Sequence, residues 1–103
     1  MQTIGAGENM PRKYNANPPR LAKRAMKVYE DRAGSLGNYK PLYEEIAARW
    51  SLVLRKQVTP AEVARMLIEM KLARWNAGYA EDHALDAANY SFIAGALDVE
   101  KEK

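Results

Sequence analysis

Apolar residues recur at steps of three and four along most of the chain, and this spacing is typical of amphipathic helices. It predicts four helices, at residues 19–32, 41–54, 60–76 and 81–98. No pair of strands is indicated. The connections between helices are short, which favours antiparallel neighbours. The predicted fold class is therefore all-α, a four-helix antiparallel bundle with a flexible N-terminal arm.

The third helix has the clearest start signal in the chain. Thr59 stands at the N-cap, Pro60 takes the first helical position, and Glu62 can reach back to the cap. The apolar stripes predict which residues of the last two helices are buried. They are Val63, Met66, Leu67, Met70 and Ala73 on the third helix, and Leu85, Ala88, Phe92, Ala96 and Val99 on the fourth.

The 103 residues suffice for one domain. Residues 1–18 are rich in Gly, Asn and Pro and lack apolar periodicity, so they are predicted to form a flexible basic arm. Residues 19–99 are then a single helical domain, and residues 100–103 a charged tail. Small helical domains often gain stability by association, so a homo-oligomer is expected.

Composition narrows the classes of function. The absence of Cys excludes disulfides, thiolate chemistry and Cys-based zinc sites. No apolar run approaches the ~20 residues that span a bilayer, and the first residues lack the apolar core of a signal peptide. We therefore expect a soluble cytoplasmic protein with no membrane partner.

The net charge of +3 is concentrated near the N-terminus, where residues 1–32 hold seven Lys or Arg against three acidic residues. Such a patch can attract the phosphates of nucleotides or of nucleic acid. A solvated helix face beside a flexible arm gives the same pattern, so both interpretations stay open.

Acidic residues interrupt the fourth predicted helix. Asp82, Asp86, Tyr90 and Ile93 fall on one side of it, which places Asp86 beside an apolar stripe. Burying an isolated ionised carboxylate is strongly unfavourable, so it needs a cation, a metal ion or several hydrogen-bond donors.

The third helix supplies the candidate partners Glu69, Lys71 and Arg74. In one interpretation Asp86 simply pairs with Arg74 or Lys71. In the other, the carboxylates of Glu69, Asp82 and Asp86 contribute to a Mg²⁺ site, and the two cations neutralise a substrate's phosphates. Both interpretations remain open from the sequence.

Other chemistry-bearing side chains give weaker signals. Glu44 is a further candidate metal ligand at the end of the bundle, whereas Glu45 is spaced to form a helix ion pair with Arg49. The single histidine, His83, has no Ser or Cys nearby and is expected to be exposed.

Three tyrosines lie in or near the predicted connections, at positions 39, 43 and 79. Their aromatic side chains could line a pocket for a nucleobase. Trp50 and Trp75 are expected at the edge of the core or at an interface.

The residues between 30 and 97 resemble a small helical domain of unknown function that is common in phage genomes. The resemblance is carried by the pattern "DR…NY…P…IAARWS…VTPAEVARMLIEMKLAR…DHALDAANY". It includes Asp31-Arg32, Tyr39, Trp50-Ser51, Thr59-Pro60, the run at residues 71–74, and Asp82, Asp86 and Tyr90.

That domain in turn looks like the MazG-like all-α nucleoside triphosphate pyrophosphohydrolases. The resemblance implies Mg²⁺ held by acidic residues, and cleavage of a (deoxy)nucleoside triphosphate to the monophosphate and pyrophosphate. It also implies the cytoplasm of the host cell as the location if a phage encodes the chain. The resemblance implies Asp86 as a metal-facing acid, with Lys71 and Arg74 at the phosphates. Together with the candidates from helical position, the expected site residues are Asp86 and Glu69 for catalysis; Asp86, Asp82, Glu69 and Glu44 for the metal; and Lys71, Arg74 and Tyr39 for the substrate.

The acidic motif departs from the MazG-like pattern. Ala48 stands where a third acid would follow Glu44-Glu45, and Asp82 and Asp86 are four residues apart where the pattern has three. Two non-enzymatic alternatives therefore remain. One is a helical protein that binds and modulates a host protein. The other is a nucleic-acid binder that uses the basic arm and the first predicted helix.

Overall fold

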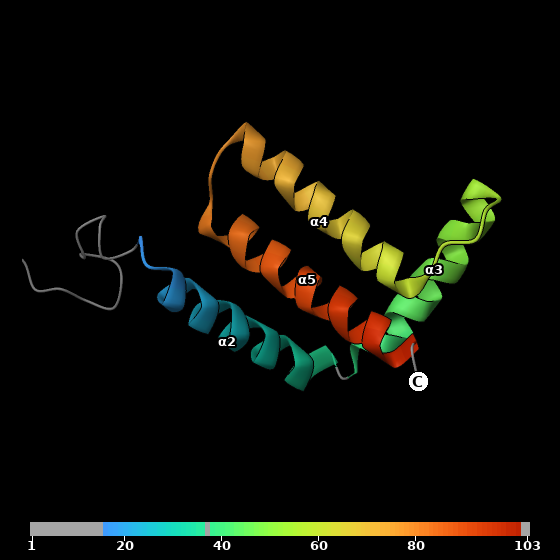
Figure 1. Cartoon of the computed structure of the whole chain (residues 1–103), viewed down its shortest axis with the longest axis horizontal. Helices are drawn as coiled ribbons and strands as arrows, with labels where there is room; N and C mark the ends of the chain where they lie inside the picture. Colours follow the sequence, from blue (N-terminus) through green and yellow to red (C-terminus); the bar gives the residue numbers. More distant parts are fainter. Residues whose placement is uncertain (1–15, 37, 102–103) are drawn as a thin grey trace, which may run out of the picture.

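The structure is a computed structural model that describes residues 16–36 and 38–101. Most of the predicted flexible arm, and the last two residues of the predicted tail, lie outside the described residues. Four helices account for nearly all of the described chain, which confirms the all-α, four-helix prediction (Figure 1). They are α2 (Pro18–Leu36), α3 (Tyr39–Leu54), α4 (Pro60–Ala77) and α5 (Glu81–Lys101).

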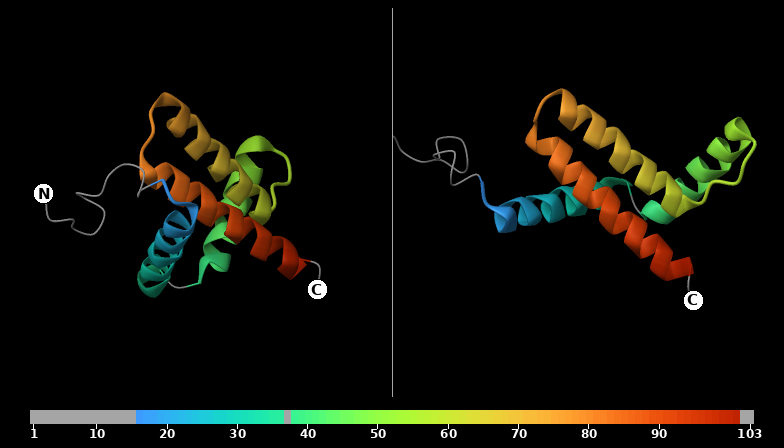
Figure 2. Two further views of the ribbon diagram at one scale, coloured as in Figure 1. Left: turned by 60° about the vertical axis from the view of Figure 1, so that its left-hand side comes forward. Right: turned by 45° about the horizontal axis from the view of Figure 1, so that its top comes forward.

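Helix α5 forms the centre of the arrangement, with α4 along one side and α2 along the other (Figure 1). Only residues 78–80 join α4 to α5, so these two helices run antiparallel. Helix α2 runs in the same direction as α5. Helix α3 crosses near the end of α5, and its C-terminal part projects away from α2 and α5 in all views (Figures 1 and 2).

The core lies where the first half of α3, the first turns of α4 and the second half of α5 meet. Four of its members are alanines, and small side chains let the helix backbones approach closely. The buried cluster consists of Tyr43, Ala47, Ala61, Val63, Ala64, Ile93, Ala94 and Leu97. Trp50 is half-buried against this cluster, which agrees with its predicted place at the edge of the core.

The buried face of α5 differs from the predicted stripe. Of the predicted residues Leu85 is buried, but Phe92 and Val99 are exposed. The helix instead buries Leu85, Asp86, Asn89, Ile93, Ala94 and Leu97. The reason is that Asp86 and Asn89 both find partners on neighbouring helices, so the face that contains them can be buried. The prediction that Met66 and Met70 of α4 are buried is also wrong, because both are exposed.

The turn from α3 to α4 is fixed by local hydrogen bonds. The hydroxyl of Ser51 donates to the carbonyl of Ala47 at 2.7 Å and accepts from the backbone N–H of Val58 at 2.8 Å. At the end of α3, Arg55 takes the left-handed conformation, with φ 55°. These contacts reverse the chain so that α4 starts against α3.

The predicted start of α4 is confirmed. The Thr59 hydroxyl accepts from the N–H of Glu62 at 3.1 Å, and the Glu62 carboxylate accepts from the N–H of Thr59 at 2.9 Å. This is the reciprocal capping box, and it satisfies two backbone donors at the helix end.

The largest departures from the predicted helix boundaries are at the C-terminal ends of α2 and α5. Helix α2 continues to Leu36, past the predicted end at Arg32, and α5 continues into the predicted tail as far as Lys101. None of the helices in the described part of the chain combines the length and apolar character needed to cross a bilayer.

Candidate functional site

A buried ion pair joins α4 to α5. The Nζ atom of Lys71 lies 2.9 Å from Oδ2 of Asp86, and the two side chains are only 13% and 10% exposed. This geometry corresponds to the first of the two interpretations of the sequence, in which Asp86 pairs with a cation of the preceding helix. Lys71 takes that role. A buried carboxylate that has such a partner avoids most of the penalty of isolation.

Arg32, near the end of α2, brings a second cation to the same carboxylate. Its Nη1 atom lies 3.6 Å from Oδ1 of Asp86, which is an ion-pair distance but too long for a hydrogen bond. The Arg32 side chain is more than half exposed, unlike that of Lys71. Each carboxylate oxygen of Asp86 therefore faces a cation, Lys71 at Oδ2 and Arg32 at Oδ1.

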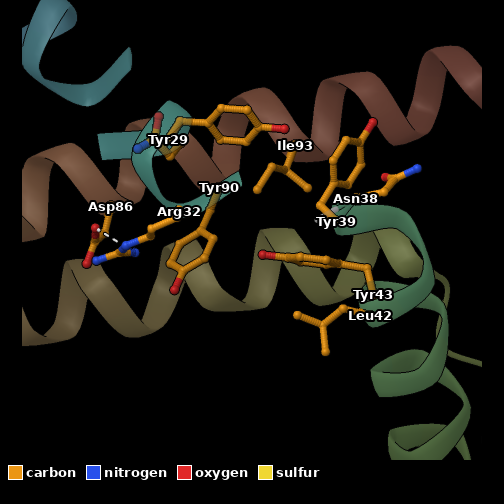
Figure 3. Close-up of a pocket in the computed structure, with 10 residues that line it drawn as sticks. Tyr29, Arg32, Asn38, Tyr39, Leu42, Tyr43, Asp86, Tyr90 and Ile93 are labelled. Carbon is orange, nitrogen blue, oxygen red and sulfur yellow. Dashed lines mark ion pairs between the residues drawn. The ribbon is translucent and has the colours of Figure 1, made fainter. Parts of the chain in front are cut away.

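A pocket of about 220 Å³ lies beside this cluster, between α2, the first turn of α3 and α5. Four of its lining residues are tyrosines. It is lined by Tyr29, Arg32, Asn38, Tyr39, Leu42, Tyr43, Asp86, Asn89, Tyr90 and Ile93. Figure 3 shows Asp86 and Arg32 at one end, Tyr39, Tyr43 and Leu42 at the other, and Tyr29, Tyr90 and Ile93 between them.

Tyr43 is the most buried tyrosine of the pocket. Burial raises the pKa of its phenol to about 12, and the neighbouring Tyr90 and Tyr29 act in the same direction. The phenol is therefore neutral at physiological pH and keeps its proton as a hydrogen-bond donor. The ring of Tyr39 meets that of Tyr43 edge-on, with centroids 6.4 Å apart.

Asn89 connects the wall of the pocket to α2. Its Nδ2 group donates to the backbone carbonyl of Ala25 at 3.0 Å, and both residues are buried. Asn38 caps α3, because its Oδ1 accepts from the N–H of Lys40 at 2.9 Å. The side chains of Asn89 and Asn38 are therefore fixed in the pocket wall, one by a hydrogen bond to α2 and the other by capping α3.

The carboxylates of the predicted Mg²⁺ set are not brought together. Glu69 borders a second hollow, between the end of α3 and α4, while Asp82 and Glu44 are exposed. Within residues 16–36 and 38–101, no three His, Cys, Asp or Glu side chains lie close enough to hold one ion. Of the four predicted metal ligands, only Asp86 lines the 220 Å³ pocket, which we call the tyrosine pocket.

The predicted substrate-binding residues also separate. Tyr39 lines the pocket, whereas Lys71 approaches it only through Asp86. Arg74 is exposed and is not part of the lining. Tyr79 packs against Trp75 and lies outside the lining as well.

His83 is half-buried in the first turn of α5 and is not exposed as predicted. Its Nδ1 atom is buried and makes no hydrogen bond within the described chain. His83 does not line the pocket.

The sequence analysis did not assign Arg32, Tyr29, Tyr90 or Asn38 to the site. One signal was present, since Asp31-Arg32, Tyr39 and Tyr90 all belong to the pattern that carries the resemblance. Arg32 is 54 positions from Asp86 in the sequence, so only the packing of α2 against α5 identifies it as a partner.

The basic residues of α2 form several ion pairs of their own. Arg20 and Arg24 both contact the carboxylate of Glu81, at 2.6 Å and 2.7 Å, and Lys27 pairs with Asp31. These pairs reduce the net positive potential of the helix. The basic arm of the nucleic-acid alternative lies mostly outside the described residues.

The fold and the pocket define a small helical domain with an aromatic cavity next to a carboxylate, Asp86, that contacts two cations. The chain belongs to the family described as a domain of unknown function (DUF6378), whose family model matches residues 20–98. The matched region contains every residue that lines the pocket. No curated protein and no solved structure matches the chain.

Proposed function

We propose that this protein binds a (deoxy)nucleoside phosphate, with the base in the tyrosine-lined pocket. The observation that supports the proposal is the combination of four tyrosines with the guanidinium-bearing Arg32 in the lining of one cavity. Aromatic side chains can stack on the flat face of any nucleobase, and a guanidinium group can bind a phosphate.

The polar groups of the pocket suit a heterocycle with hydrogen-bonding edges. Binding pockets are mostly apolar, and a few placed polar groups fix the ligand's orientation. Here Leu42 and Ile93 supply apolar surface, while Asn38 and the phenols supply donors and acceptors. A purely aliphatic ligand would leave these polar groups without partners.

The resemblance to the MazG-like enzymes agrees with a nucleotide ligand and extends the proposal to hydrolysis of a deoxynucleoside triphosphate. Hydrolysis of that kind uses Mg²⁺ and several carboxylates. Within the described residues the carboxylates do not form such a set, because Asp86 is paired with two cations and Glu69 borders a different hollow. We therefore confine the proposal for the single chain to binding and assign no step to a metal ion.

A thermal-unfolding screen with nucleotides tests the proposal, because a ligand that binds only the folded state raises Tm. We expect a rise in Tm with at least one deoxynucleotide. Tyr39→Ala should weaken that rise, whereas Tyr79→Ala, a tyrosine outside the pocket, should not. The proposal is wrong if no nucleotide changes Tm. A parallel assay for pyrophosphate release tests the hydrolytic extension.

A second role, self-association, is favoured by an exposed apolar surface on α3. Leu52 and Val53 are 80% and 81% exposed, and Leu54 beside them is 55% exposed. Apolar side chains gathered in this way often mark an interface. The adjoining hollow is lined by both signs of charge, including Lys56, Arg65 and Glu69.

A surface that carries both signs can match a second copy of itself across a two-fold axis. We therefore propose a homodimer that forms through the exposed end of α3. Light scattering during size exclusion should give twice the mass of 11.6 kDa. Val53→Glu should reduce the mass to that of one chain, whereas Val99→Glu, also exposed but on α5, should leave the dimer intact. A monomeric wild-type protein would contradict this role.

A further inference from the structure

We infer that Asn89 of α5 reads the edge of the base in the tyrosine pocket, and that its Oδ1 atom selects nucleobases with an exocyclic amino group, such as adenine and cytosine. This inference rests on the proposed function, because it specifies which bases the same pocket takes. It does not depend on which group of the protein holds the phosphate.

The orientation of the Asn89 amide is fixed by a neighbouring helix. Its Nδ2 group donates to the backbone carbonyl of Ala25 in α2 at 3.0 Å. A backbone carbonyl can only accept, so the amide cannot turn over without losing this hydrogen bond. The other polar atom of the side chain, Oδ1, accepts no hydrogen bond from any of the described residues. Asn89 is only 8% exposed and lines the pocket, so a ligand in the pocket can supply the missing donor.

The other amide and carboxylate acceptors of the lining are already in use. Both oxygens of Asp86 face a cation, one from α4 and one from α2. Oδ1 of Asn38 accepts a backbone N–H at the start of α3. Of these three side chains, only Asn89 keeps an acceptor that no group in the described part of the chain occupies. A buried acceptor without a donor is unfavourable, so it marks a position for a donor of the ligand.

The chemistry of the bases decides which donor suits this oxygen. The exocyclic amino group of adenine or cytosine projects from the ring and carries two N–H donors. The ring N–H of thymine or uracil instead lies between two carbonyl oxygens. Asn89 has no donor to offer these oxygens, because its Nδ2 group is held by Ala25. They would therefore face Oδ1 with a partial charge of the same sign.

The phenol of Tyr43 supplies a complementary donor. Its hydroxyl makes no hydrogen bond with the described residues, and Figure 3 shows it directed toward Tyr90, in the middle of the pocket. Because burial raises its pKa to about 12, the phenol keeps its proton at physiological pH. In adenine and cytosine the ring nitrogen beside the amino group is an acceptor. The pocket thus offers an acceptor and a donor to bases that present a donor and an acceptor.

Isothermal titration calorimetry with two pairs of monophosphates tests this inference. The first pair is deoxyadenosine monophosphate and purine deoxyriboside monophosphate, which lacks only the amino group. The second pair is deoxycytidine monophosphate and deoxyuridine monophosphate, in which a carbonyl oxygen replaces the amino group. The phosphate is the same within each pair, so a difference in Kd comes from the base. We expect the amino member of at least one pair to bind at least about tenfold more tightly.

Asn89→Leu should remove this preference, so that the two members of each pair bind equally. This variant also loses the hydrogen bond to Ala25, and a control for lost stability is therefore needed. Ser51→Ala removes hydrogen bonds of the turn between α3 and α4, outside the pocket, so it should lower Tm but keep the preference. If Asn89→Leu does not fold, the wild-type titrations alone decide.

The possible results separate the two proposals. A difference below tenfold within both pairs, or tighter binding of the members without an amino group, overturns this inference while the nucleotide pocket stands. A folded Asn89→Leu variant that keeps the wild-type preference has the same consequence. If none of the four monophosphates binds, this inference fails, and the thermal-unfolding screen shows whether the proposed function fails with it.

Discussion

The ammonium group of Lys71 in α4 lies 2.9 Å from the carboxylate of Asp86 in α5, and the two side chains are only 13% and 10% exposed. Removing Lys71 leaves the Asp86 carboxylate with only the longer contact to Arg32, at 3.6 Å, and a largely buried charge that loses its close partner is strongly unfavourable. We therefore predict that Lys71→Met lowers the free energy of unfolding by about 3 kcal/mol. Chemical denaturation with urea measures this loss.

The exposed pair between Lys40 and Glu100, 3.8 Å apart, provides the control. Lys40→Met should change stability by less than about 1 kcal/mol. Combining Lys71→Met with Asp86→Leu should restore much of the loss, because the second change removes the carboxylate that has lost its close partner. If Lys71→Met proves as mild as Lys40→Met, the pair contributes little to stability.

The phenol of Tyr43 gives a prediction at alkaline pH. Its pKa is raised to about 12 by burial, whereas an unfolded tyrosine ionises near pH 10. The unfolded state therefore loses this proton first as the pH rises. The stabilising contribution of the Tyr43 phenol to the free energy of unfolding is fully present below about pH 10 and is lost between about pH 10 and 12.

Urea denaturation at pH 8, 10 and 11.5 measures the effect, on the order of 2 kcal/mol for a shift of this size. Tyr43→Phe should make stability less dependent on pH over this range. Tyr79→Phe, at an exposed tyrosine, should retain the wild-type dependence. Identical profiles for wild type and Tyr43→Phe would show that this phenol is not responsible.

The capping box of α4 gives a prediction at acid pH. Hydrogen bonds from Thr59 lower the pKa of the Glu62 carboxyl below its usual value. Its stabilising contribution is present above the unfolded pKa of about 4.3 and is lost as the pH falls through the lower pKa of the folded state. The free energy of unfolding should therefore fall as the pH is lowered. It should fall less steeply in the Glu62→Gln variant, which lacks this carboxyl group.

Thr59→Ala removes the other half of the capping box. We expect it to lower the free energy of unfolding by about 1 kcal/mol at pH 7. Ser91→Ala, at an exposed position inside α5, is the matched control and should have little effect. Urea denaturation at pH 7 and pH 3 measures these variants together with Glu62→Gln. A Thr59→Ala variant as stable as the wild type would show that the cap is dispensable.

The end of α3 gives a prediction of increased stability. Arg55 is the only non-glycine residue with positive φ in the described chain, at 55°. Side chains other than glycine are strained in this conformation. Arg55→Gly should therefore raise the free energy of unfolding by about 0.5–1 kcal/mol.

Lys56→Gly is the control for Arg55→Gly, because Lys56 has an ordinary negative φ. Glycine there only increases the freedom of the unfolded chain, so this variant should be neutral or less stable. Thermal unfolding of both variants distinguishes the two effects. A fall in Tm for Arg55→Gly would show that the arginine side chain contributes more than its backbone strain.

The sequence was sufficient for features that depend on neighbouring residues. Apolar spacing predicted four helices, and the order Thr59-Pro60 with Glu62 predicted the start of α4, because a cap is built within one turn of the chain. Pairing of Asp86 with a cation of the preceding helix was one of two interpretations. The sequence could suggest that cation because α4 and α5 are adjacent antiparallel helices, which limits the residues that can meet.

Tertiary packing alone decided the rest. Which face of α5 is buried depends on whether Asp86 and Asn89 find partners, and those partners lie in α4 and α2. Arg32 becomes the second cation of Asp86, and the tyrosines of three separate segments become one pocket, only once the helices are packed. Local periodicity fixes which residues share a side of one helix, but it contains no information on how that side is rotated against its neighbours.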